Sequence, residues 1–141
     1  MDVDDGRART ALHRASPPDV ILLDTNALIW LEQGHARSRR LNRSRQAVYI
    51  SPANLLELQF LSETGRIRLK HGSVRALADD PRWALDDPPA WTWFAKAIEQ
   101  GWTRDPFDRL LVAHARLRGW RLATSDEPLL AQLADHERLE L

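Results

Sequence analysis

Four acidic residues stand in surroundings where a carboxylate has few structural reasons to be. Asp24 and Asp126 each close a short run, in the segments LLD and LATSD, and Glu57 interrupts the apolar segment NLLELQFL. Asp108 lies in DPFDRLL, directly before residues that resemble the start of a buried helix. Because an unpartnered buried carboxylate is costly or stays protonated, these acids indicate either ion pairs or a negatively charged cleft.

A cleft lined by carboxylates favours a divalent metal ion. The chain has no cysteine, so thiolate ligands are excluded, and oxygen ligands point to Mg²⁺ or Mn²⁺. Like charges held close together raise one another's pKa unless a cation is present. Such a site can position and polarise a phosphodiester and generate hydroxide from bound water at neutral pH, as one- and two-metal nucleases do.

Helix capping is the structural alternative for the two acids at strand ends. Aspartate is a favoured N-cap, and a helix is expected directly after both Asp24 and Asp126. Capping explains Asp126 about as well as chemistry does. It explains Asp24 less well, because Thr25 or Asn26 could cap the next helix instead.

The two acids of DPFDRLL divide between structure and chemistry. Asp105 before Pro106 has the pattern of an N-cap with proline at the first helical position, so we assign it mainly to structure. Asp108 could complete a capping box, but apolar residues follow it at once, and we assign it mainly to chemistry. For Glu57 the structural alternative is a buried arginine.

The elements that must position these acids alternate along the chain. Strands are expected over residues 20–23, 47–50, 83–85 and 120–124, and helices over 26–33, 36–45, 51–65, 73–78, 89–100 and 105–119. This alternation predicts a single three-layer α/β domain with a central parallel sheet flanked by helices. Since ligands bind at the carboxyl ends of the strands in such sheets, Asp24 and Asp126 should converge at one edge.

The totals agree with one globular domain. The chain has 141 residues, of which 43% are hydrophobic and 28% charged. Residues 1–18 are polar and are expected to form a mobile N-terminal extension, with the folded domain over 19–141. No apolar run reaches the roughly 18 residues that cross a bilayer, and residues 1–18 lack the apolar centre of a signal peptide. We therefore expect a cytoplasmic protein that does not associate with membranes.

Three segments in this order resemble PIN-domain proteins and, within that superfamily, the VapC-type toxins of bacterial toxin–antitoxin pairs. They are LLDTNALIWL at 22–31, SPANLLELQFLSETGRIRL at 51–69 and DPFDRLLVAHARLRGWRLATSD at 105–126. The resemblance covers about Val20 to Asp135. It implies a PIN-like fold, in which the family's acids fall on Asp24, Glu57, Asp108 and Asp126.

The resemblance also implies supporting roles for nearby residues. Asp105 is a candidate accessory ligand. Thr25 and Asn26 match the family's DTN-type turn and are expected to orient Asp24, as Ser125 is expected to orient Asp126.

The activity that the resemblance implies is that of a Mg²⁺- or Mn²⁺-dependent endoribonuclease, which hydrolyses RNA phosphodiesters with a metal-activated water. Its implied partners are a second copy of the chain, in a homodimer, and a cognate VapB-type antitoxin. One alternative is a catalytically silent PIN-like module that binds RNA or protein. Another is a phosphohydrolase of the haloacid-dehalogenase kind, but that chemistry requires a second acid where this chain has Asn26.

The basic residues are candidates for contacts with a partner. The formal net charge is zero, which argues against a strong nonspecific grip on nucleic acid, although nearly all positive charge is arginine. The densest cluster is predicted to be either a solvated helix face or a contact for the RNA backbone or antitoxin; it contains Arg37, Arg39, Arg40, Arg43 and Arg45. Arg109 could steady Asp108 or contact phosphate.

The histidines and tryptophans are assigned to structure. The five histidines lack the paired spacing of a zinc site, and His114 is expected in packing or at the surface. Core packing or a dimer interface is favoured over base stacking for Trp83, Trp91, Trp93 and Trp102.

Overall fold

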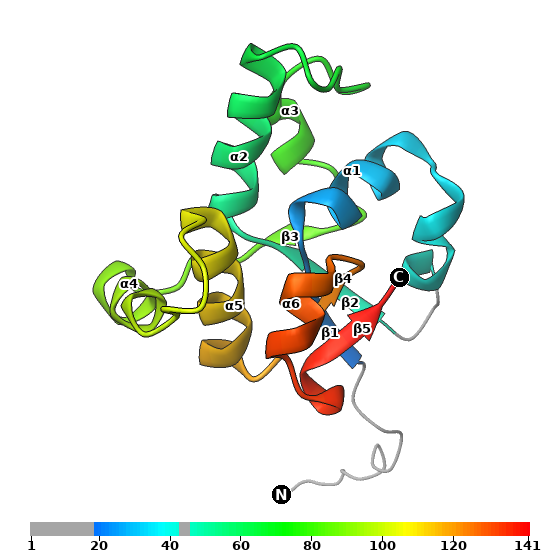
Figure 1. Ribbon diagram of the computed structural model, residues 1–141. Helices are drawn as coiled ribbons and strands as arrows, with labels where there is room; N and C mark the ends of the chain where they lie inside the picture. Colours follow the sequence, from blue (N-terminus) through cyan, green and yellow to red (C-terminus); the bar gives the residue numbers. More distant parts are fainter. Residues whose placement is uncertain (1–18, 43–45) are drawn as a thin grey trace, which may run out of the picture.

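Five parallel strands form the central sheet of the computed structural model, which describes residues 19–42 and 46–141 (Figure 1). The strands are β1 Asp19–Leu23, β2 Gln46–Ile50, β3 Ala84–Leu85, β4 Arg121–Thr124 and β5 Arg138–Glu140. Their order across the sheet is β3-β2-β1-β4-β5. β1 therefore lies at the centre, with a neighbouring strand on each edge.

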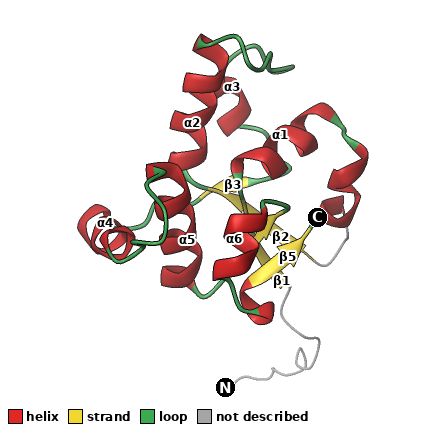
Figure 2. Ribbon diagram, in the orientation of Figure 1, coloured by secondary structure: helices red, strands yellow, loops and turns green. Residues whose placement is uncertain are grey.

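Helices connect the strands and cover the sheet (Figure 2). In chain order the helices are α1 Thr25–Gln33, the 3₁₀ helix η1 Ala36–Asn42, α2 Pro52–Glu63, α3 Val74–Ala78, α4 Ala90–Ile98, α5 Pro106–Arg118, α6 Glu127–Gln132 and the 3₁₀ helix η2 Asp135–Glu137. Across the described ranges, no helix has both the length and the apolar character to cross a membrane.

The central strand β1 packs through both of its faces. Ile21 and Leu23 belong to a core shared with α1 and α3, while Leu22 belongs to a second core shared with α4, α5 and α6. All three side chains are fully buried, and burying each contributes about 1.5–3 kcal/mol. The expected α/β fold, with helices on both faces of a parallel sheet, is thus confirmed.

The start of α2 is fixed by a capping box. Ser51 Oγ accepts a hydrogen bond from the Ala53 N–H at 3.1 Å, and Asn54 Oδ1 accepts one from the Ser51 N–H at 2.7 Å. Because Ser51 directly follows β2, this cap fixes α2 at the carboxyl end of that strand. Glu57, on the second turn of α2, is thereby held near the same edge of the sheet.

The arginine-rich segment differs from its expected form. A helix was predicted over 36–45, but Ala36–Asn42 forms a 3₁₀ helix. Ser38 and Leu41, which are both buried, are three residues apart, and this spacing places them on one face of a 3₁₀ helix. Arg43 and Arg45, together with the predicted N-terminal extension 1–18, lie outside the described residues.

The strand β5 was not predicted. Arg138 and Glu140 of this strand are charged, so the segment shows no apolar run. It pairs with β4 alone and lies at one edge of the described sheet, where the other side of the strand has no neighbouring strand.

Candidate active site

Parallel pairing of β1 with β4 brings the two strand-end acids to one edge of the sheet. Leu23 lies opposite Ala123, and the Asp24 N–H donates to the Ala123 carbonyl at 3.0 Å. Asp126 follows two residues after the end of β4. The acids that the sequence placed at the carboxyl ends of two strands therefore face the same region, as open α/β sheets require of a ligand site.

A pocket of about 180 Å³ lies at this edge, and we call it the acid pocket. Its acidic lining residues come from four parts of the chain and are Asp24, Glu57, Asp105, Asp108 and Asp126. The remaining lining residues are Thr25, Asn26, Leu61, Leu111 and Leu129, so none of the described lysines or arginines lines it. The structure thus brings together all four predicted acids and the candidate accessory residue Asp105.

A second, larger cavity differs in chemistry. It measures about 830 Å³ and lies between α2 and α3, and we call it the α2–α3 groove. Its lining mixes apolar residues such as Leu55 and Val74 with Arg75 and one carboxylate, Asp79. Its size does not make it the catalytic candidate, because it lacks grouped titratable side chains.

Asp24 is both a helix cap and a member of the acid pocket. Its side chain accepts a hydrogen bond from the Ala27 N–H at 2.7 Å, so Asp24 itself caps α1, and neither Thr25 nor Asn26, the other possible caps, takes that position. The residue is only 4% exposed. Burial raises the pKa of Asp24 to about 6, although the Thr124 hydroxyl and the Ala27 N–H favour its charged form.

Glu57 is held by Thr25, not by an arginine. Thr25 Oγ1 donates to Glu57 Oε1 at 2.5 Å, and Asn54 Nδ2 donates to Thr25 Oγ1 at 3.2 Å. Asn54 Nδ2 also donates to the Leu23 carbonyl at 3.2 Å, which ties α2 to the end of β1. Burial, and then the charge of Asp105, raise the pKa of Glu57. Thr25 was expected to orient Asp24, and its observed bond is instead to Glu57.

The apolar surroundings of Glu57 are not a closed core. Leu56 is 52% exposed and Phe60 is 49% exposed, so part of the apolar surface of α2 faces solvent. Glu57 lies on a partly buried side that reaches the acid pocket. The apolar neighbours in NLLELQFL therefore overstated how deeply this residue is buried.

Asp105 and Asp108 occupy different positions at the start of α5. Asp105 Oδ1 accepts from the N–H groups of Phe107 and Asp108, at 2.8 and 3.2 Å, which is the predicted N-cap. The capping box suggested for Asp108 is not formed, because the Asp105 N–H donates to Thr103 Oγ1 at 3.1 Å. Both acids nevertheless line the acid pocket.

Asp108 has the most strongly raised pKa in the acid pocket. Burial is the largest cause, followed by the charges of Asp105, Asp126, Glu57 and Asp24, and together they raise the pKa of Asp108 to about 7. All five acids therefore interact electrostatically. A group with such a pKa exchanges protons near neutrality, which is where catalytic acids and metal ligands are often found.

The residues expected to assist the acids have other partners. Ser125 Oγ accepts from Arg37 Nη1 at 3.5 Å, while the Asp126 N–H donates to Thr124 Oγ1 at 3.0 Å. Thr124 was not singled out from the sequence. Asn26 lines the acid pocket and is exposed, and no bond from its side chain to Asp24 is formed among the described residues.

Arg109 fastens the connection between α4 and α5. Its Nε donates to the Thr103 carbonyl at 2.8 Å and its Nη1 to the Ile98 carbonyl at 3.5 Å. Among the described residues no bond joins Arg109 to Asp108, one of the two predicted partners of this arginine. Of the arginine-rich cluster, Arg37 lies beside Ser125, and Arg40 donates to the Glu140 carbonyl at 2.8 Å.

Ser51, His114 and Asp86 resemble a hydrolase triad, but Ser51 and His114 are buried and Asp86 is partly exposed. His114 Nδ1 lies 2.9 Å from Ser51 Oγ and Nε2 lies 2.7 Å from Asp86 Oδ2. Ser51 and His114 are fully buried, and Ser51 Oγ caps α2, so no substrate reaches this hydroxyl. Burial lowers the pKa of His114, which agrees with the packing role expected for it.

The tryptophans divide between core and surface. Trp83 and Trp93 are buried, as core packing predicts, and their indole N–H groups donate to the Leu77 and Leu110 carbonyls. Trp91 is 73% exposed on α4.

The carboxylate oxygens that line the acid pocket make it the region best suited to a divalent cation. Within residues 19–42 and 46–141, no three acidic or histidine side chains are already arranged as a complete metal-binding cluster. Five carboxylates nevertheless line one pocket, and the pKa values of three of them are raised partly by the other charges. A divalent cation is the simplest group that offsets such repulsion.

Comparisons with known proteins agree with this geometry. The sequence profile described as the PIN domain matches residues 21–135. A comparison with curated protein sequences gave no match.

Three similar solved structures show the fold. One is VapBC2 from Rickettsia felis bound to a DNA fragment from the promoter, at 19% identity and a TM-score of 0.54, covering 76% of this chain and 88% of that chain. A toxin–antitoxin complex from Klebsiella pneumoniae is 17% identical with a TM-score of 0.59, covering 86% and 99%. The PIN domain endonuclease Utp24 is 21% identical with a TM-score of 0.51, covering 87% and 92%.

Proposed function

The chain belongs to the PIN-domain family, and from that premise we propose that it is a divalent-metal-dependent endoribonuclease, the toxin of a VapBC-type toxin–antitoxin pair. The observation that carries this proposal is the acid pocket, where five carboxylates meet and none of the described lysines or arginines joins the lining. RNA as the substrate rests on the resemblance to VapC-type toxins.

Mg²⁺ or Mn²⁺ fits the donor chemistry of the acid pocket. Both ions take oxygen ligands, and Mg²⁺ is usually held by one or two carboxylates while it keeps several waters. That preference suits a pocket whose described side chains do not form a complete ligand set. When bound, the ion would polarise a phosphodiester and lower the pKa of a water molecule.

Each acid has a role in this proposal. Asp24, Glu57, Asp108 and Asp126 hold the ion and orient the scissile phosphate, and Asp105 caps α5. Thr25 positions Glu57 through its 2.5 Å bond, and Thr124 positions Asp126 through the backbone N–H. The apolar side of the pocket, formed by leucines, limits the water around the reacting phosphate.

Two exposed apolar surfaces are candidate contact surfaces for protein partners. α4 presents Trp91, Phe94 and Ile98, which recur at helical spacing, and we propose this face for a homodimer. α2 presents Leu56 and Phe60 in its exposed part, and the α2–α3 groove that Leu56 lines is the surface we propose for a VapB-type antitoxin. We place the complex in the cytoplasm.

RNA cleavage by the purified protein tests the proposed activity. We expect fragments from a mixed RNA pool in Mg²⁺ or Mn²⁺ and none in EDTA. Asp126→Asn should abolish cleavage, whereas the matched control Glu127→Gln, which removes the exposed acid next to it, should not. Cleavage by Asp126→Asn at the wild-type rate contradicts the assignment.

The same experiment distinguishes the proposed ribonuclease from a catalytically silent binding module. Such a module would bind RNA or protein without producing fragments in any metal. The haloacid-dehalogenase alternative is not supported, because Asn26 lines the acid pocket at the position where that chemistry requires a second acid.

A further inference from the structure

Trp30, His35 and Arg37 form a stacked cluster where α1 gives way to η1. The Trp30 and His35 ring centroids lie 5.6 Å apart at an interplanar angle of 28°. The guanidinium carbon of Arg37 lies 5.1 Å from the centroid of the Trp30 ring, and the Arg37 N–H donates to His35 Nδ1 at 3.0 Å. The indole therefore forms a shelf that holds the arginine in one orientation.

The shelf directs Arg37 toward the acid pocket. Arg37 Nη1 lies 3.5 Å from Ser125 Oγ, and Ser125 stands between the last residue of β4 and Asp126. Asp126 lines the acid pocket. The guanidinium thus contacts the residue that precedes Asp126, and the charged residues that line the acid pocket are all negative.

Arg37 retains donors for a ligand. Among the described residues no carboxylate pairs with it, and Ser125 takes one of its five N–H donors, leaving the others for a ligand. Other arginines of the described chain are committed to carboxylates; these are Arg82, Arg116, Arg118, Arg121 and Arg138. The exposed, preoriented fork of Arg37 has the geometry that matches phosphate oxygens.

We propose that Arg37, held against Trp30 beside Ser125, is a positioning residue that grips a backbone phosphate of the RNA strand entering the acid pocket. This inference rests on the proposed function, because it places the strand relative to the acids. A polyanion approaching five carboxylates is repelled, and a fixed cation nearby offsets part of that repulsion. The flat guanidinium can pair with a carboxylate or a phosphate, so the choice of a phosphodiester rests on the proposed cleavage of RNA in the acid pocket.

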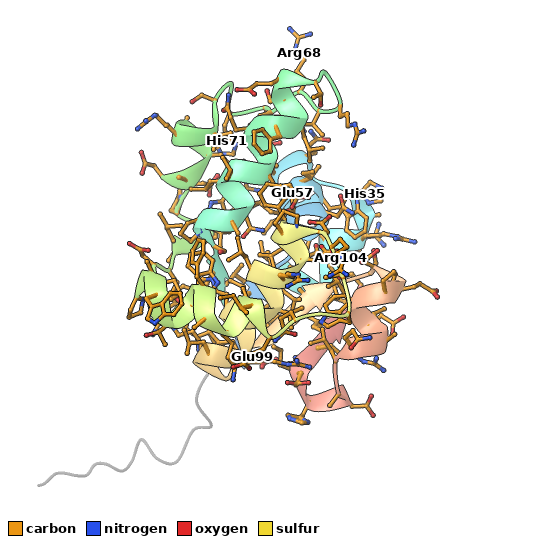
Figure 3. All side chains as sticks on the ribbon, turned by 60° about the vertical axis from the view of Figure 1, so that its left-hand side comes forward. His35, Glu57, Arg68, His71, Glu99 and Arg104 are labelled. Atoms are coloured by element: carbon orange, nitrogen blue, oxygen red, sulfur yellow. The ribbon has the colours of Figure 1, made fainter. Side chains whose placement is uncertain are left out.

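Binding of an uncleaved RNA tests the role of Arg37 without requiring catalysis. The probe is a fluorescein-labelled single-stranded oligonucleotide with 2′-O-methyl riboses, measured by anisotropy between about 50 and 200 mM KCl. The buffer contains EDTA, because a metal-activated water needs no 2′-hydroxyl and could cut this probe in Mg²⁺. The proteins are wild type, Arg37→Ala, Arg37→Lys and Trp30→Leu. Arg68→Ala is the matched control, because it removes an exposed arginine that lies well away from His35 and Glu57 (Figure 3).

Arg37→Ala should bind about tenfold more weakly than wild type at low salt. The plot of log affinity against log salt should become less steep by about 0.7, the contribution of one phosphate contact in a single strand. Arg37→Lys should keep the slope and lose part of the affinity, since it keeps the charge without the planar fork. Trp30→Leu should also keep the slope but weaken binding, because it removes only the shelf.

Equal affinity and slope for Arg37→Ala and Arg68→Ala overturn the proposal. So does a loss by Arg37→Ala of binding to a VapB-type antitoxin with unchanged RNA binding, which would assign the cluster to a protein partner. Wild type that binds this probe but leaves the mixed RNA pool uncut in Mg²⁺ or Mn²⁺ refutes the proposed ribonuclease, and the losses of affinity and slope in Arg37→Ala then decide the role of Arg37 separately. Wild type that does not bind the probe refutes the role of Arg37, and the cleavage assay decides the ribonuclease.

Discussion

Thr25 Oγ1 donates to Glu57 Oε1 at 2.5 Å, and this bond joins the helix that follows the central strand to the middle of α2. Thr25 in turn accepts from Asn54, which also donates to the last carbonyl of β1. The three side chains form one chain of hydrogen bonds between two elements. The orientation of Glu57 in the acid pocket therefore depends on a residue next to Asp24.

Removal of the Thr25 hydroxyl should impair catalysis more than folding. We expect Thr25→Val, which keeps the side-chain volume, to lower the rate of RNA cleavage about 10- to 100-fold, the usual effect of losing a residue that orients a metal ligand. Thr25→Ser keeps the donor and should stay within a few-fold of wild type. Equal rates for the valine and serine variants would show that Glu57 needs no such support.

Asp108 should destabilise the metal-free protein at neutral pH. Its pKa is about 7 in the folded protein against an ordinary value of 3.8, so the folded state favours the protonated form. The contribution of Asp108 to stability is therefore most favourable below about pH 4 and falls as the pH rises toward 7, because the unfolded chain loses this proton first.

Asp108→Asn should remove most of that decline. In EDTA at pH 8 we expect its free energy of unfolding to exceed that of wild type by about 1–2 kcal/mol, less than the full pKa shift implies because the group is only half buried. Urea denaturation at several pH values measures this, with the exposed Asp87→Asn as control. An Asp108→Asn protein with the wild-type pH dependence contradicts the electrostatic coupling of the acids.

Asp105 should act as a cap and not as a required ligand. Asparagine caps helices about as well as aspartate, so Asp105→Asn should keep both stability and cleavage within a few-fold of wild type. Asp105→Ala should lose about 1 kcal/mol of stability, because the Phe107 and Asp108 N–H groups lose their acceptor. Loss of cleavage in Asp105→Asn, with stability intact, would instead assign Asp105 to the metal.

His71 should stabilise the protein only while it is protonated. Its two ring nitrogens lie 2.8 Å from Glu32 Oε2 and 2.8 Å from Asp80 Oδ2, and Glu32 is fully buried. The hydrogen bond to Glu32, and then that to Asp80, raise the pKa of His71 above 6.5. Arg82, and then His71, hold the pKa of Asp80 below 3.8.

The sign of each shift defines the pH range of this network. The contribution of His71 is fully present below pH 6.5 and is lost as the pH rises through its folded pKa, while that of Asp80 is present above pH 3.8 and is lost in acid. At pH 5–6 we expect His71→Gln to cost on the order of 3 kcal/mol, since it removes the cation that faces buried Glu32. The cost should shrink in alkali, and the exposed His136→Gln serves as control. A constant cost from pH 5 to 9 would mean that His71 acts as a neutral group.

The gathering of the acids could be predicted from the sequence. Val20 to Leu23 is a continuous apolar run, typical of a central parallel strand, and the acids after such strands must share an edge. Glu57 and Asp108 were found because each interrupts or precedes an apolar helix segment. Each of these signals is local in the sequence. The parallel topology of the sheet then brings the four acids together at one edge.

The partners of the acids could not be predicted in the same way. Asn54 reaches Thr25 across 29 positions of sequence, and Thr124 and Arg109 bind groups whose positions depend on loops. The sequence contained one hint for Asn54, its place three residues after Ser51, which is the capping-box position. Propensity alone does not say that the same amide also supports Thr25.

The exposed apolar side chains were also beyond prediction. Leu56 and Phe60 look like core residues in NLLELQFL, because α2 is apolar around most of its circumference and contributes to both cores. Which part of such a helix meets solvent depends on how its neighbours cover it.

Mn²⁺ binding is the measurement that tests the shared metal site most directly. Isothermal titration at pH 6.5 and 7.5, in buffers that differ in ionisation enthalpy, reports both affinity and protons released. We expect wild type to bind Mn²⁺ with net proton release that is larger at pH 6.5, because the folded pKa values of Asp24 and Asp108 are about 6 and about 7. The double variant Asp24→Asn, Asp108→Asn should show no binding heat. Mn²⁺ binding by that variant with the wild-type affinity and proton count would contradict the account.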